Sequence, residues 1–167
     1  ISTPFDDVIV VLVDPDMLFQ RPFINDFSDF PIDHLWSRHF QKNPESIHYK
    51  VTHGHPMAQD YSFGQSWLVA GAKNLAHIVG PNSPVHKVTA KEANTLYPAG
   101  PPYVLTARDM YRVAYHLVDF LPRLFEIFPK FMSEMYAYCL AAAHLGLPHQ
   151  LARGFMVSNV EMDVGEG

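Results

Sequence analysis

The chain has 167 residues, of which 48% are hydrophobic and 17% are charged, so it is long enough to bury a core and too apolar for a disordered tail. Seventeen acidic residues outweigh 12 Lys and Arg residues, and the net charge of −5 with no basic stripe argues against nucleic acid as a partner. No apolar run approaches the ~20 residues that span a bilayer. We therefore expect a single domain over residues 1–167, without membrane contact by this segment.

The first strong element is the apolar run of residues 8–13, which ends at Asp14. An apolar run without alternation is typical of a buried central strand in a parallel or mixed sheet. The ring-rich region that follows is irregular, with one helix expected over residues 34–41 and a short strand over residues 49–52.

The middle of the chain carries helical spacing over residues 66–79, with Gly80 as the stop signal. A short helical turn is expected over residues 90–94. Residues 103–105 have the composition of a second buried strand.

Two further helices are expected in the C-terminal part. Thr106 and Asp109 resemble a capping box at the start of the first, which Pro122 should kink or end. Ser133 should cap the second, over residues 134–145. Strands and helices in this order predict a mixed α/β layer fold.

Asp14 and Asp16 directly follow the first strand and flank a proline. Ligands of open α/β sheets bind beyond the carboxyl ends of the strands, and carboxylates suit a hard cation such as Mg²⁺ or Mn²⁺. The alternative is that both residues are solvated turn formers.

Glu134 is the second candidate, in the first turn of the last helix. It is either a residue that favours the helix dipole or a general base or sugar ligand at the border of a pocket. Cys139 should be a packed core thiol. The histidines, including His53 and His55, lack the spacing of a zinc site.

The aromatic segment of residues 19–40 has two interpretations. It is either a platform for an extended proline-rich acceptor, because polyproline helices dock on aromatic grooves, or ordinary core and loop packing.

Together these motifs resemble those of the plant and green-algal peptidyl serine α-galactosyltransferases and hydroxyproline O-arabinosyltransferases. The matching segments occur in order along nearly the whole chain, at residues 13–18, 21–23, 55–64, 100–105, 133–138 and 141–149. Residues 133–136 and 146–149 are closer to the serine enzymes.

The resemblance implies a GT-A-like mixed sheet flanked by helices, a UDP-sugar donor and Mn²⁺ (or Mg²⁺) at Asp14 and Asp16, with Glu134 as the active-site acid. The acceptor is then a Ser or hydroxyproline hydroxyl of a hydroxyproline-rich glycoprotein, with galactose favoured over arabinose as the sugar. The family works in the Golgi or ER lumen as type II membrane-anchored proteins. The competing interpretation is a non-catalytic binding module that keeps the fold.

Only thirteen residues precede Asp14, whereas the GT-A fold places several nucleotide-binding strands before this position. We therefore expect a partial catalytic domain that lacks the N-terminal nucleotide-binding strands. Such a domain should bind a UDP-sugar weakly and expose an apolar sheet face or edge.

Overall fold

The computed structural model describes residues 3–17 and 22–155, and a mixed four-stranded sheet lies at its centre. Across the sheet the strands are β1 (Ile9–Leu12), β3 (Ala99–Thr106), β2 (Met57–Asp60) and β4 (Gln150–Ala152). This architecture confirms the expected α/β class with a mixed sheet flanked by helices.

Strand direction gives the sheet two chemically different ends. β3 is antiparallel to both β1 and β2, and β2 is parallel to β4. Consequently β1, β2 and β4 all run the same way, and their carboxyl ends share one end of the sheet. β3 starts at that end, and Tyr103 in its middle is level with Leu12 of β1 and Ala58 of β2.

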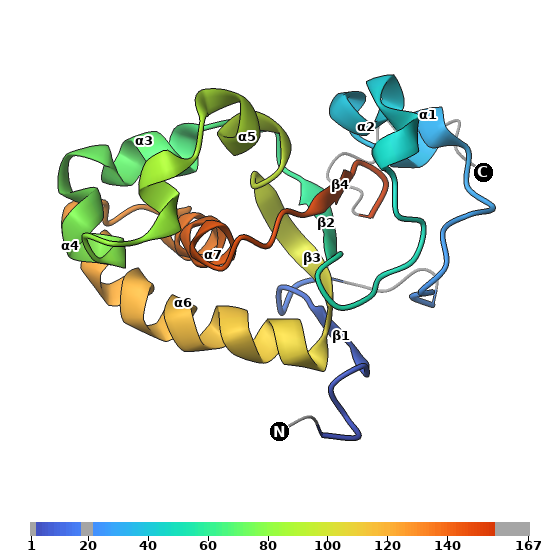
Figure 1. Cartoon of the computed structure of the whole chain (residues 1–167), viewed down its shortest axis with the longest axis horizontal. Coiled ribbons are helices and arrows are strands. Elements are labelled where there is room, and N and C mark those ends of the chain that lie inside the picture. The colour runs from blue at the N-terminus through green and yellow to red at the C-terminus, as the bar shows by residue number, and fades with distance from the viewer. Residues whose placement is uncertain (1–2, 18–21, 156–167) are drawn as a thin grey trace.

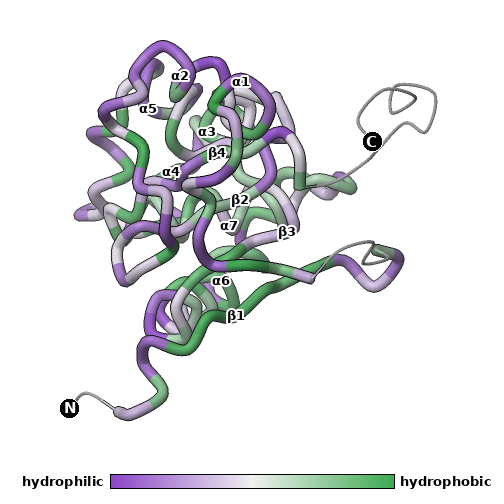
Figure 2. The backbone as a smooth tube through the Cα atoms, turned by 90° about the vertical axis from the view of Figure 1, so that its right-hand side faces the viewer, coloured by the Kyte–Doolittle hydropathy of each residue, from purple (hydrophilic) through white to green (hydrophobic). Residues whose placement is uncertain are grey.

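The expectation of a buried central strand over residues 8–13 was wrong in its position. Within the described part of the chain β1 pairs with β3 alone, so it is an edge strand, and Val8 and Leu12 are 50% and 42% exposed. Figure 2 shows β1 as a hydrophobic stretch at the border of the molecule. Hydrophobicity and β-branching predict that a segment is a strand, but they do not report how many neighbours it has.

Helices cover the sheet unequally (Figure 1). The larger group lies on one side: α3 (Ser66–Gly71), α4 (Leu75–Val79), α5 (Ala90–Thr95), α6 (Ala107–Ile127) and α7 (Ser133–His144). Two short helices, α1 (Ile32–Leu35) and α2 (Arg38–Lys42), lie on the other side. Single 3₁₀ turns are η1 (Pro44–Ser46), η2 (Ala72–Asn74) and η3 (Pro84–Lys87).

The centre of the core is α7, in which ten of twelve residues are buried. Tyr138 of this helix stacks on Tyr103 of β3 with ring centroids 3.8 Å apart, which joins the helix layer to the sheet. Cys139 is fully buried, and burial raises the pKa of its thiol, as expected for a core cysteine.

Two of the expected helices are broken in the structure. The helix expected over residues 34–41 is interrupted at Trp36 and Ser37. The Ser37 N–H donates to the Leu151 carbonyl, and Trp36 forms an isolated antiparallel bridge with Ala152 of β4. The helix over residues 66–79 turns at Gly71, where an added Cβ would lie 2.9 Å from the Ile78 side chain. Residues 49–52 form only isolated bridges, and the short helix near residue 90 is confirmed as α5.

Thr106 caps α6 as expected, since its side chain accepts the Asp109 N–H. Pro122 does not end the helix, which continues to Ile127. The carbonyl that loses its partner four residues earlier belongs to exposed Val118, where water can replace the missing N–H. No helix in the described ranges is long and apolar enough to cross a bilayer.

Candidate functional site

The carboxyl ends of β1, β2 and β4 bring polar residues from distant parts of the chain to one end of the sheet. Asp14 and Asp16 follow β1, Asp60 ends β2 and Tyr61 follows it, and Arg153 follows β4. This is the position at which α/β sheets bind ligands.

Asp14 and Asp16 are both exposed and lie in the turn that leaves β1, where the Met17 N–H donates to the Asp14 carbonyl over 3.1 Å. Partial burial raises the pKa of the Asp14 carboxyl, and the charges of Asp16 and Glu134 raise it further. A carboxylate held beside two others stores repulsion that a cation would relieve.

Glu134, the candidate acid, is exposed in the first turn of α7. Its charge raises the pKa of Asp14, as that of Asp16 does, so the three carboxylates named from the sequence interact electrostatically. They come from two elements, the turn after β1 and the start of α7.

Ser133 holds this helix start in a way that differs from the expected cap. It lies inside α7. Its hydroxyl donates to the Phe128 and Lys130 carbonyls and accepts a hydrogen bond from the Lys130 N–H. A serine preceding Glu is typical of an N-cap. Here the side chain instead closes the turn between α6 and α7, and this fixes the backbone next to Glu134.

Aromatic rings line the same end of the sheet. Burial raises the pKa of Tyr61, and the charges of Asp14 and Asp16 add to the shift. The Tyr61 ring lies against Gly100, where an added Cβ would be only 2.2 Å away, so glycine at this point of β3 makes room for the ring. Tyr103 lies within the field of both Asp14 and Tyr61.

The chain leaves β2 through a constrained turn. Ser62 has a φ of 55°, a conformation that side chains rarely adopt, and its N–H donates to Asp60 Oδ1 over 2.8 Å. Non-glycine residues in this region are frequent at functional sites.

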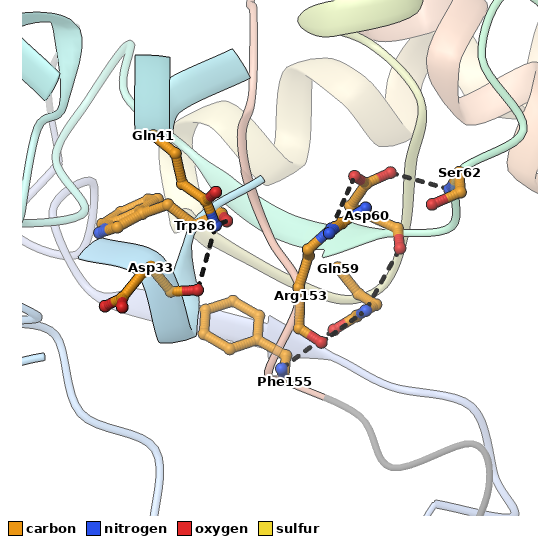
Figure 3. A network of polar contacts seen from close by, with 8 residues as sticks. All are labelled: Asp33, Trp36, Gln41, Gln59, Asp60, Ser62, Arg153 and Phe155. Atoms are coloured by element: carbon orange, nitrogen blue, oxygen red, sulfur yellow. Dashed lines mark hydrogen bonds and ion pairs between the residues drawn. The ribbon is translucent and has the colours of Figure 1, made fainter. Parts of the chain in front are cut away.

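Asp60 and Arg153 form an ion pair across β2 and β4, at 3.9 Å between Oδ2 and Nε (Figure 3). Gln59 fixes the chain after β4, because it donates to the Arg153 carbonyl and accepts the Phe155 N–H. This pair was not predicted from the sequence, because neither residue carries a local pattern that indicates the pairing of β2 with β4.

Asp14 and Asp16 supply the oxygen donors that a hard divalent cation prefers. In the described ranges no three His, Cys, Asp or Glu side chains are close enough to hold a metal on their own. A cation held by two carboxylates alone would need its remaining ligands from other sources, such as phosphate oxygens and water.

The histidines are used elsewhere. His53 Nδ1 lies 2.8 Å from Asp109 Oδ1 at the opposite end of the sheet, and buried His149 bonds Tyr138 at 2.8 Å. Asp109, interpreted from the sequence as part of a capping box, is fully buried and also accepts the Gly54 N–H over 2.8 Å.

The aromatic segment is largely structural. Phe27, Trp36 and Phe40 are buried, while Phe30 is partly exposed and Phe19 lies outside the described residues. This burial favours ordinary packing over an acceptor platform.

The chain matches no known protein family, no curated protein and no solved structure.

Proposed function

We propose that this chain belongs to a metal-dependent glycosyltransferase with a GT-A-like sheet, which transfers a sugar from a UDP-sugar to a protein hydroxyl. The observation that supports the proposal is that Asp14, in the turn after β1, has its pKa raised by the charges of both Asp16 and Glu134. Two of these residues occupy an Asp-x-Asp turn, and the third comes from a well-anchored helix.

Mn²⁺ or Mg²⁺ held by Asp14 and Asp16 would neutralise the diphosphate leaving group as a Lewis acid. The protein residues have separate tasks. Glu134 either accepts the proton of the acceptor hydroxyl or contacts the sugar as positive charge develops on it. Tyr61, beside both aspartates, provides an apolar wall with a hydroxyl group at the border of the site.

The acceptor in this proposal is a Ser or hydroxyproline residue of a hydroxyproline-rich glycoprotein in the Golgi or ER lumen. Galactose is favoured as the sugar because residues 133–136 and 146–149 are more similar to the serine galactosyltransferases; arabinose is the alternative.

The test measures sugar transfer from UDP-galactose and UDP-arabinose to a Ser- and hydroxyproline-rich peptide, with and without Mn²⁺. Asp16→Asn should lower Mn²⁺-dependent turnover by about 100-fold or more while leaving thermal unfolding unchanged, because an exposed acid contributes little to stability. Asp29→Asn, an exposed aspartate distant in sequence from the turn, is the matched control and should keep full turnover.

Glu134→Gln separates chemistry from binding. It keeps size and hydrogen bonding but removes the charge, so turnover should fall by about 100-fold while UDP binding is retained. Glu45→Gln, also exposed, should have no effect. Equal turnover in wild type and Asp16→Asn would overturn the metal assignment, and Mn²⁺ and UDP binding without transfer would favour the binding module.

A further inference from the structure

An apolar stripe on the outer surface of α6 has no partner in the described part of the chain. It consists of Tyr111, Tyr115, Val118, Pro122 and Phe125, which we call the outer stripe. Tyr111 is 74% and Val118 71% exposed. In Figure 1 the helix lies at the border of the molecule, with α7 on its inner side. A soluble domain rarely exposes a continuous row of large apolar side chains without a binding role.

The inner face of the same helix already forms part of the core. Its residues recur every three or four positions and pack against the sheet and α7: Met110, Val113, Leu117, Phe120, Leu124 and Ile127. The outer stripe lies on the opposite face, so folding of this domain does not bury it. A helix that only covered a core would carry polar residues there.

The spacing of the outer stripe identifies the shape of its partner. Successive members are separated by four, three, four and three residues, which is the heptad repeat of two helices packed side by side. Over the 14 residue steps from Tyr111 to Phe125 it is about 21 Å long, or two heptads. A second helix is therefore the surface that fits it.

Charged residues flank one side of the outer stripe and indicate which helix is its partner. Arg112, Asp119 and Glu126 are seven residues apart and lie next to Tyr111, Val118 and Phe125. If two copies of α6 cross antiparallel about a two-fold axis near Asp119, Arg112 of each copy faces Glu126 of the other. Val118 then packs against Pro122, and Tyr115 against Phe125.

The remaining charge at the axis is already neutralised. Asp119 is paired with Arg123 of the same helix, so two copies meet without an unpaired acid. Among the described residues, the ion pairs of Arg112 and Glu126 are long, at 3.9 Å to Asp109 and 3.7 Å to His77. They are therefore available to pair across the interface.

We propose that the outer stripe of α6 is a self-association surface, on which two copies of this chain pack their α6 helices antiparallel with Arg112 opposite Glu126. The arrangement is isologous, because each residue pair occurs twice about the two-fold axis.

Sedimentation velocity of the purified protein over about 5 to about 500 μM tests the proposal in the range expected of a small interface. Wild type should approach twice the monomer mass with rising concentration. Val118→Glu should stay monomeric with unchanged circular dichroism and thermal unfolding, since its exposed side chain supports no core contact. A wild type that is monomeric throughout overturns the proposal.

A charge exchange tests the antiparallel geometry. Arg112→Glu and Glu126→Arg should each weaken the dimer by about tenfold or more, because each places like charges opposite one another. The double variant should restore wild-type association, since the pairs are re-formed with reversed sign. A dissociation constant that neither single substitution changes, or a double variant that still associates weakly, overturns the proposed pairing.

Discussion

At the end of the sheet where β1, β2 and β4 begin, Asp109 is fully buried and accepts hydrogen bonds from the Gly54 N–H and the Thr106 hydroxyl, with His53 at 2.8 Å. At the end where these strands finish, Asp14 is exposed and lies in the field of Asp16 and Glu134. The first carboxylate is surrounded by donors, and the second by like charges.

This difference distinguishes an acid whose charge is bound into the fold from one whose oxygen atoms are open to a ligand. The donors around Asp109 connect α6, the loop before β2 and the end of β3, so its charge is committed to the fold. In the described ranges no hydrogen bond or ion pair to the Asp14 carboxylate is present. Its oxygen atoms remain available for a ligand, and the stacked rings of Tyr103 and Tyr138 lie between the two ends.

The largest effect on the free energy of unfolding should come from a substitution of Asp109. Asp109→Asn replaces one acceptor oxygen by an N–H₂ group that faces donors, and it removes the charge opposite His53. Each hydrogen bond to a buried charged group contributes about 1.5 to 3 kcal/mol, and the Gly54 N–H and the Thr106 hydroxyl both donate to this carboxylate. Urea unfolding should show the loss of these contributions in the free energy of unfolding.

Asp119→Asn is the matched control on the same helix, since Asp119 is exposed and, among the described residues, pairs with Arg123 alone. It should change stability by no more than about 0.5 kcal/mol. Equal stability of both variants would mean that Asp109 is not the anchor of this end.

The role of Asp109 illustrates what sequence reasoning could and could not supply. The local part, Thr106 capping a helix with Asp109 in its first turn, was predicted and is confirmed. The contacts with His53 and Gly54 depend on a chain segment more than fifty residues away, and no local pattern encodes them.

Strands show the same limit. β1 and β3 were found because they are rich in Val, Ile, Leu and Tyr, whereas β2 and β4, with sequences MAQD and QLA, contain no β-branched residue. They are strands because β3 and the loop around Trp36 lie beside them. Asp14, Asp16 and Glu134 could be named from local motifs and stay a prediction as a site, whereas Asp60 and Arg153 are recognisable as a pair only once β2 and β4 lie side by side.

The second effect concerns His149, which is fully buried, accepts from the Tyr138 hydroxyl and donates from Nδ1 to the Leu147 carbonyl. Burial lowers its pKa to about 4. The unfolded chain takes up this proton near its ordinary pKa of about 6.5, so folding stability is complete above that pH and is lost as the pH falls toward 4. The loss should reach about 3 kcal/mol.

Urea unfolding of wild type and His149→Gln at pH values from about 7.5 to about 4.5 measures this effect. The variant should be less stable at neutral pH and should lose less stability on acidification. His116 and His144, whose pKa values burial also lowers, remain in both proteins and cancel in the difference. Parallel pH profiles would assign the acid sensitivity to other groups.

A moderate effect is expected at the start of α7. Ser133→Ala removes the hydroxyl that bonds the Phe128 and Lys130 carbonyls and leaves these groups to relax or to find water, at a cost of about 1 to 3 kcal/mol. Because the same turn positions Glu134, turnover should fall more than stability alone explains. Thermal unfolding and sugar transfer measured on the same sample separate the two, and Ser28→Ala in an exposed turn is the control.

The smallest effect should appear at Asp14, and it has the opposite sign to that at Asp109. Because the pKa of Asp14 is raised in the fold by burial, Asp16 and Glu134, the folded protein holds its proton more tightly than the unfolded chain does. The fold is therefore favoured below this pKa, and that stability is lost as the pH rises through it. Asp14→Asn should be more stable than wild type at neutral pH by a few tenths of a kcal/mol, since the exposed site is well screened by solvent. The gain should vanish near pH 3 and in high salt, and Asp29→Asn should show neither change.

Mn²⁺ should raise the melting temperature of wild type more than that of Asp14→Asn, because only wild type presents both carboxylates of the proposed metal site. A loss of stability in Asp14→Asn at neutral pH would show that this carboxylate serves the fold in the same way as Asp109.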